Sequence, residues 1–290
     1  MSKSNRSRLA MTLSMIIFGT ISVFVRGVAL PSGELALLRT AIAIVPIGLY
    51  LLLSKQKFNV AALKKQGFLL FLSGAALGMN WILLFEAYKY TTVSTATLCY
   101  YFAPVIVTVV SSVLFREKMT LWQGVCFAMS TAGLVMIVGF GDLRASGRGI
   151  LFGLGAAVLY ASVVLLNKAI RGADGLARTF FQFAAAGIVL LPYVLLTGGF
   201  HLPSLDVGAL AMLLTVGLIH TGVAYCLYFA SVGNLQGRQI ALFSYVDPLT
   251  AVLVSVFVLS ESITPLQILG GVMILGFSLA SEWAAKPADR

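Results

Sequence analysis

The sequence predicts an all-α integral membrane protein of ten transmembrane helices, arranged as two inverted five-helix repeats around a central cavity. Three observations predict this class: an apolar composition, apolar runs of membrane-spanning length, and an internal repeat at an offset of 144 residues. Of the 290 residues, 59% are hydrophobic and only 10% are charged, and the mean hydropathy is +0.98. So few polar side chains cannot cover a water-soluble protein of this length, and we therefore expect a lipid-facing surface.

The apolar runs are about 20 residues long, enough to cross a hydrocarbon core of about 30 Å as α-helices. They are continuously apolar rather than alternating, which favours helices over the strands of an outer-membrane barrel. The first run has basic residues before it but no cleavage site after it, so we expect a retained helix and not a signal peptide. The predicted spans are residues 9–30, 34–53, 67–88, 93–115, 120–139, 149–170, 176–197, 207–230, 237–260 and 264–283.

The net charge of +10 follows a membrane orientation. With the N-terminus in the cytoplasm, fifteen Lys and Arg residues fall on the inner side and four on the outer side, while Arg39 lies within the second run. This positive-inside bias predicts a multi-pass protein with both termini in the cytoplasm. Because orientation explains the basic excess, no nucleic-acid partner is expected. The four outer residues are Arg26, Lys89, Arg144 and Arg148.

Proline positions indicate the internal repeat. Pro46 and Pro192 are 146 residues apart, and Pro104 and Pro248 are 144 apart. At the 144-residue offset, ten of the 41 positions from residue 83 to residue 123 are identical, and Pro-x12-Glu-x2-Thr-x2-Gln occurs twice in register. Five helices per half is an odd number, so the halves run in opposite senses, as in many secondary transporters. We predict repeats over residues 1–140 and 141–290.

Two segments carry a resemblance to a known family. The stretch TLCYYFAPVIVTVVSSVLFREKMTLWQG, repeated as LFSYVDPLTAVLVSVFVLSESITPLQILGG, resembles the EamA-type drug/metabolite transporter superfamily. The likeness extends over nearly the whole chain, and the aromatic-rich helices are most similar to bacterial exporters of aromatic amino acids. The resemblance implies a bacterial inner-membrane protein with a central cavity that exports amino acids or related metabolites.

Polar-tipped aromatic residues in the middle of the spans are candidates for lining a substrate path. Thr221, Tyr225 and Tyr228 share one helix face, and Trp81 occupies the position of Tyr225 in the first half. Such residues also occur as packing aromatics or in interfacial belts, which is the alternative interpretation. The candidate substrate-binding residues are Asn80, Trp81, Tyr100, Tyr101, Tyr160, His220, Tyr225, Tyr228, Ser244 and Tyr245.

The repeated motif also supplies candidate moving parts. Pro104 and Pro248 each remove an intrahelical hydrogen bond, so we expect hinges in the fourth and ninth spans. Glu117 and Glu261 follow these spans on opposite faces of the membrane. They either stabilise the N-terminus of the next helix or latch the two gates.

Two charged residues lie outside the repeat pattern. Arg39 either snorkels outward or pairs with a carboxylate such as Glu86. Asp247 has no acidic counterpart, because Ala103 occupies the equivalent position, and proton coupling is one hypothesis for it.

The sequence lacks the motifs of other classes of protein. There is no Walker A sequence for an ATP-driven pump, and no nucleophile elbow or H-E-x-x-H of an enzyme. Cys99, Cys126 and Cys226 lie in apolar runs without metal-ligand spacing, so we expect buried free thiols and no metal or cofactor. The expected partners are a small neutral or zwitterionic solute and the lipid bilayer, with a monomer as the working unit. A channel, or an exporter of drugs, nucleosides or sugars, is the open alternative.

Overall fold

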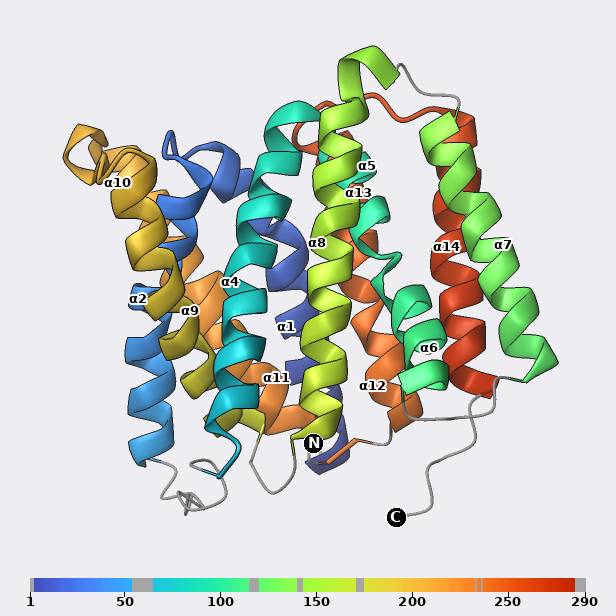
Figure 1. The fold of residues 1–290 in the computed structure, drawn as a ribbon, viewed down its shortest axis with the longest axis horizontal. Helices are drawn as coiled ribbons and strands as arrows, with labels where there is room; N and C mark the ends of the chain where they lie inside the picture. The colour runs from blue at the N-terminus through green and yellow to red at the C-terminus, as the bar shows by residue number, and fades with distance from the viewer. Residues whose placement is uncertain are drawn as a thin grey trace.

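The computed structural model describes residues 3–53, 65–114, 120–139, 143–170, 175–232, 234–235 and 237–284. Every regular element in these ranges is a helix, so the predicted all-helical fold is confirmed (Figure 1). The elements are α1 (Lys3–Arg26), α2 (Ser32–Leu53), α4 (Gly67–Tyr90), α5 (Val93–Tyr100), α6 (Ala103–Leu114), α7 (Leu121–Gly139), α8 (Leu143–Ala169), α9 (Gly175–Thr197), η1 (Leu202–Ser204), α10 (Val207–Gly217), η2 (Leu218–Val223), α11 (Ala224–Val232), α12 (Gly237–Ser244), α13 (Val246–Phe257) and α14 (Pro265–Ala284).

The helices are long and apolar enough for a membrane protein. Among the described residues, seven helical segments have the length and hydropathy to cross a bilayer, and three shorter apolar helices accompany them. Each predicted span coincides with one helix or with consecutive helices, while the count of ten crossings stays a prediction. The largest boundary differences are at the starts of the first and sixth spans, where α1 and α8 each begin six residues before the predicted start.

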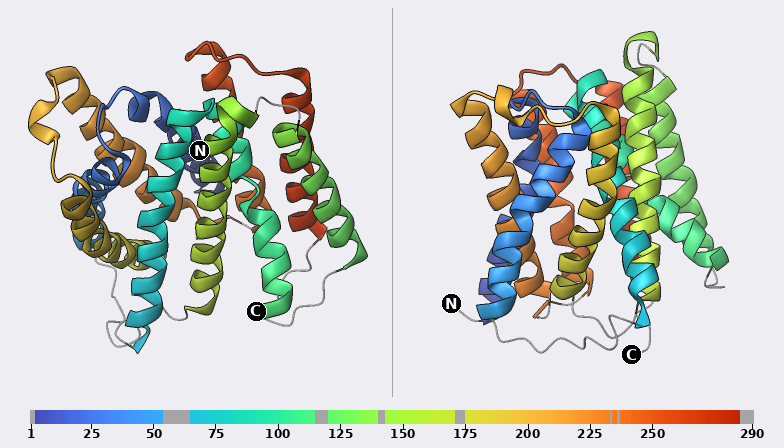
Figure 2. Two further views of the ribbon diagram at one scale, coloured as in Figure 1. Left: turned by 45° about the horizontal axis from the view of Figure 1, so that its top comes forward. Right: turned by 60° about the vertical axis from the view of Figure 1, so that its left-hand side comes forward.

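The helices form a bundle in which α1 begins and α14 ends at the same end, the lower end of Figure 1. Helix α4 packs against α8 and α9, whereas α10, η2 and α11 pack against α1 and α2. Helices α7 and α14 pair with each other at one side of the bundle (Figures 1 and 2). The largest core cluster joins α2, α4, α9 and α10, with Ile47, Phe85, Phe183 and Val216 at most 1% exposed.

Three of the predicted spans depart from a regular α-helix. Helices α5 and α6 are separated at Tyr101 and Phe102, and α12 and α13 are separated at Tyr245. Pro104 and Pro248 therefore lie in the first turns of α6 and α13, where a missing N–H removes no regular helical bond. The eighth span is continuous but contains the π-helix η2 between α10 and α11.

Backbone contact between α7 and α14 depends on two glycines. A Cβ atom on Gly270 would lie 2.5 Å from the carbonyl oxygen of Gly133, and one on Gly133 would lie 2.6 Å from that of Gly270. Small residues allow membrane helices to approach closely and to gain van der Waals contact. The pair therefore packs at a distance that any larger residue would increase.

We expect Gly270→Ala to destabilise the protein by about 1–3 kcal/mol, because the added methyl group meets backbone atoms. Gly276→Ala is the matched control on the same helix, since a Cβ at Gly276 has no neighbour within 4 Å. Thermal unfolding can be followed with a thiol-reactive dye, because Cys99 and Cys126 are free and buried, as predicted. Equal melting temperatures for the two variants would contradict the close packing.

Candidate functional site

Arg39 is a buried charge in the middle of α2. Its side chain is 5% exposed, its Nε donates to Thr221 Oγ1 at 2.6 Å, and its guanidinium lies 4.3 Å from the ring centre of Trp81. Both expectations for this residue are therefore wrong: it does not snorkel outward, and Glu86 pairs instead with Lys89 at 2.9 Å. The aromatic ring and the hydroxyl stabilise the cation more than an apolar environment would.

The π-helix η2 places Thr221 opposite Arg39. The hydroxyl of Thr221 donates to the carbonyl oxygen of Val216 five residues earlier, at 2.8 Å, so its lone pairs face the guanidinium. A Cβ on Gly222 would lie 2.3 Å from Cγ of Pro46, so α2 approaches η2 closely at this turn. Single π-turns inside α-helices are frequent at functional sites because they re-aim side chains.

His220 occupies the same π-turn but faces α1. Its Nε2 lies 3.1 Å from Thr20 Oγ1, its Nδ1 lies 3.3 Å from the carbonyl oxygen of Thr215, and its ring packs on Phe24 at 4.5 Å. Both ring nitrogens thus have neighbours, and the side chain is 3% exposed. The arrangement ties η2 to α1.

A first group of aromatic rings extends from Arg39 across the bundle. Trp81 contacts Phe183 edge to face at 5.2 Å, and Phe183 contacts Tyr225 at 5.4 Å. Tyr225 in turn contacts Phe18 at 5.1 Å and lies alongside Phe229. Tyr228 packs on Phe229 from the same helix, α11, at 5.0 Å. The predicted stripe on the eighth span therefore meets Trp81 through Phe183.

A second aromatic group surrounds the break between α5 and α6. Tyr100 contacts Tyr101 at 5.7 Å and Tyr160 at 5.3 Å. The hydroxyl of Tyr101 donates to Asp247 Oδ2 at 2.5 Å, which links this break to the first turn of α13. Helix α1 lies next to both aromatic groups, because Phe18 contacts Tyr225 and a Cβ on Gly19 would lie 2.6 Å from the carbonyl oxygen of Asp247. The sequence offered no partner for Asp247, and the structure supplies Tyr101.

The remaining predicted polar residues lie within helices or at a helix break. Asn80 is fully buried and donates from Nδ2 to the carbonyl oxygen of Ala156 at 2.6 Å, which joins α4 to α8. Ser244 donates to the carbonyl oxygen of Ile240 one turn earlier on α12, at 2.9 Å. Tyr245 is 8% exposed at the break between α12 and α13.

Glu261 connects three segments of the chain. Its carboxylate pairs with Arg26 and accepts hydrogen bonds from Ser255 Oγ and, at 2.8 Å, from the backbone N–H of Val93. It thus stabilises the N-terminus of α5 and not that of the next helix, α14. The N-terminus of α14 has its own cap, in which Thr264 and Gln267 exchange hydrogen bonds at 2.9 and 3.2 Å. Glu117 lies outside the described residues.

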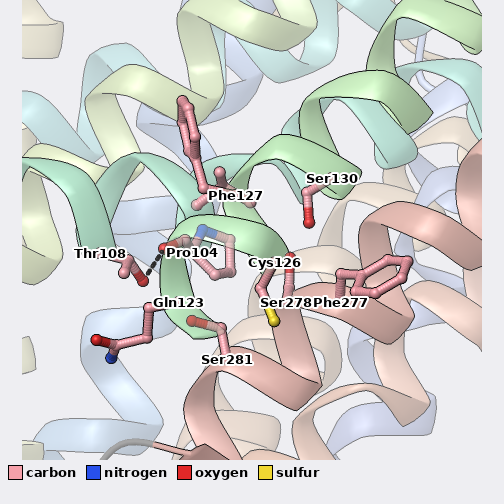
Figure 3. Close-up of a pocket in the computed structure, with 10 residues that line it drawn as sticks. Pro104, Thr108, Gln123, Cys126, Phe127, Ser130, Phe277, Ser278 and Ser281 are labelled. Atoms are coloured by element: carbon pink, nitrogen blue, oxygen red, sulfur yellow. Dashed lines mark hydrogen bonds between the residues drawn. The ribbon is translucent and has the colours of Figure 1, made fainter. Parts of the chain in front are cut away.

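Two pockets adjoin these groups. A cavity of about 410 Å³ lies between the upper ends of α1, α2 and α4, lined in part by Leu35, Phe85 and Tyr88. A second, smaller pocket lies between α6, α7 and α14 next to Pro104, with Gln123 and Ser130 among its polar lining residues (Figure 3). Among the described residues, no group of three His, Cys, Asp or Glu side chains could hold a metal ion.

An arginine, an aspartate and several tyrosines gathered between apolar helices form a polar site inside the membrane-spanning region. Ionisable residues at such positions are costly and mark the paths of solutes or ions. Fold and site together define a membrane transporter.

The family model described as the EamA-like transporter family matches residues 6–139 and again residues 147–281, so the chain belongs to this family. It is 31% identical over 270 residues to the uncharacterized transporter YxxF of Bacillus subtilis, covering 92% of this chain and 86% of the relative. It is 26% identical over 263 residues to protein PecM of Dickeya dadantii, covering 89% and 86%. A protein of known crystal structure shares the fold with a TM-score of 0.64 at 17% identity, covering 96% of this chain and 98% of that one.

The free energy of interaction between Arg26 and Glu261 can be measured by a double-mutant cycle with Arg26→Gln and Glu261→Gln. We expect a coupling free energy of about 0.5–3 kcal/mol, because the pair is part of a hydrogen-bonded group and Glu261 is only 10% exposed. The reference pair is Lys89 and Glu86, exposed by 46% and 24%, for which about 0.2–0.5 kcal/mol is expected. For each pair, the unfolding free energies of the wild-type protein, the two single variants and the double variant are measured. No greater coupling for Arg26 and Glu261 than for the reference would contradict a stabilising latch.

Proposed function

We propose that the protein is a secondary transporter that exports neutral amino acids, aromatic ones included, across the bacterial inner membrane by alternating access. The observation that carries this proposal is the double match of one transporter family to residues 6–139 and 147–281. It supports two related repeats, residues 1–140 and 141–290, and with five crossings each the repeats have opposite orientations. Inverted repeats give one central site two equivalent exits.

The packing of the helices supports this symmetry. The third span of the first half, α4, packs on the first two spans of the second half, α8 and α9. The third span of the second half, α10 to α11, packs on the first two spans of the first half, α1 and α2. Helices α7 and α14 are each the last of their half and pack on one another. Exchanging the halves therefore reproduces these neighbours.

The same comparison supports a structure that is closed at one end. Helix α5 packs on α13, and Ser94 Oγ donates to Ser255 Oγ at 2.7 Å. The equivalent elements, α12 and α6, pack less extensively over their described residues. At their end of the bundle Lys168 donates to Ser111 Oγ, the repeat equivalent of Ser255, at 2.8 Å. With cytoplasmic termini, the end at which α5 packs on α13 faces outward.

Within this proposal the residues have different roles. The two aromatic groups line the substrate path, and Asn80 and His220 hold helices around it. Ser244 and Tyr245 lie at the break between α12 and α13, and Glu261 latches the outer gate. Aromatic linings with one arginine and one aspartate carry no net charge, which favours amino acids over phosphate esters. The working unit is a monomer in the bilayer. The substrate path lined by the aromatic groups comprises Trp81, Tyr100, Tyr101, Tyr160, Tyr225 and Tyr228.

A counterflow measurement in liposomes tests the function. Vesicles loaded with unlabelled phenylalanine should accumulate labelled phenylalanine transiently, because a carrier exchanges its substrate across the membrane. The uptake should saturate, whereas uptake through a channel would not. Parallel vesicles loaded with a nucleoside or a sugar serve as controls. Counterflow of one of these solutes without counterflow of amino acids would overturn the proposed substrate class.

The proposed hinges can be tested with Pro104→Ala and Pro248→Ala. Each substitution restores a backbone donor next to a helix break, so we expect transport rates to fall several-fold while the fold is kept. Pro265→Ala is the control, since Pro265 is exposed at the start of α14, which has no break. If both variants transported at the rate of the control, neither proline would act as a hinge.

A further inference from the structure

Arg39 is only partly satisfied by the protein. Of its donors, Nε has an acceptor in Thr221, but no described residue accepts a hydrogen bond from Nη1 or Nη2. Nor does any described carboxylate form an ion pair with it, although the side chain is 95% buried in the span of α2. A buried guanidinium with two free nitrogens can bind a planar acceptor, and a carboxylate accepts two parallel hydrogen bonds from it.

Asp247 is the complementary case on the other side of the aromatic residues. Tyr101 donates to Oδ2, but no described residue donates to Oδ1, and no described cation pairs with the carboxylate. The residue is half-buried in the first turn of α13. A carboxylate in this position is stabilised by an ammonium group, which supplies both a charge and hydrogen-bond donors.

Aromatic side chains lie between the two charges. On one side, the guanidinium of Arg39 lies over Trp81, which contacts Tyr225 through Phe183. Tyr225 also contacts Phe18 of α1 at 5.1 Å, and a Cβ on the next residue, Gly19, would lie 2.6 Å from the carbonyl oxygen of Asp247. The charged groups therefore lie around one set of aromatic side chains, without pairing to each other. Phe85 and Tyr88, which border this set, also line the cavity of about 410 Å³.

We propose that Arg39 and Asp247 are the two poles of a binding site for a zwitterionic amino acid, a proposal that rests on the proposed transport function. Arg39 binds the carboxylate and Asp247 binds the ammonium group, while the tyrosines and Trp81 contact the side chain. A solute with only a carboxylate would leave Asp247 without a cation, and one with only an amine would leave Arg39 without an anion. A zwitterion compensates both charges at once, and the interaction between opposite charges is stronger in low-dielectric surroundings than in water.

The first test compares three ligands on the purified wild-type protein. L-phenylalanine carries both charges, 3-phenylpropionate only the carboxylate, and phenethylamine only the ammonium group. Because a hydrogen-bonded charge contact is worth about 10- to 100-fold in affinity, phenylalanine should bind at least about 10-fold more tightly than either analogue. Equal or tighter binding of an analogue would overturn the proposal, and this test needs no variant.

The second test assigns each pole to its residue. Asp247→Asn should weaken phenylalanine binding about 10-fold or more, with little change for 3-phenylpropionate. Arg39→Gln should weaken phenylalanine binding by a similar factor, with little change for phenethylamine. Arg39→Lys serves if Arg39→Gln does not fold, because lysine keeps the charge but cannot bind a carboxylate in the bidentate way. Arg148→Gln, an exposed residue at the start of α8, is the matched control for loss of a positive charge.

Counterflow measured in parallel separates the two proposals. Wild-type exchange of phenylalanine that is unchanged in both Asp247→Asn and Arg39→Gln would overturn the binding site and leave the transport function intact. Selective binding of phenylalanine with the expected losses, but without counterflow, would support the site and overturn the transport function. Unselective or absent binding of phenylalanine would overturn the site.

Discussion

The burial of Arg39 is the constraint on which the centre of the molecule depends. A guanidinium between apolar helices must be compensated, and the protein does so with the ring of Trp81 at 4.3 Å and the hydroxyl of Thr221 at 2.6 Å. These partners come from α4 and from η2, so α2, one helix of its own half and one of the other half must meet at this point. The π-turn of η2 and the close contact of Gly222 with Pro46 follow from that meeting.

The two ends of the bundle differ although their elements are related. At one end Glu261 joins Arg26, Ser255 and Val93 in a single network. At the other end the equivalent serine, Ser111, accepts a hydrogen bond from Lys168, and α6 packs on α12 less extensively than α13 packs on α5 in the described part of the chain. The alternating access that we propose would open one network while its counterpart forms.

Sequence reasoning located the aromatic site better than the charged one. Trp81 and Tyr225 were found because they occupy equivalent positions in the repeat and share helix faces with other polar-tipped residues. The predicted environment of Arg39 was wrong. Its span and its charge were evident, but its partner, Thr221, lies 182 residues away in the sequence. The signal for it was an arginine inside an apolar run, which indicates a functional site more often than a snorkelling side chain. For Glu261 the sequence left two roles open, a cap of the next helix or a latch, and its contacts with Val93 and Arg26 lie outside that helix.

By itself the sequence determined the helical membrane class, the positions of the spans, the breaks near Pro104 and Pro248, and the free state of the cysteines. These properties depend on local hydropathy, on proline geometry and on the absence of paired spacing, all of which can be read along the chain. Only the tertiary structure decided which side chains meet: Tyr101 with Asp247, Arg39 with Thr221, and Glu261 with α5. Such contacts join residues more than 140 positions apart, and they depend on how whole helices pack rather than on any local pattern.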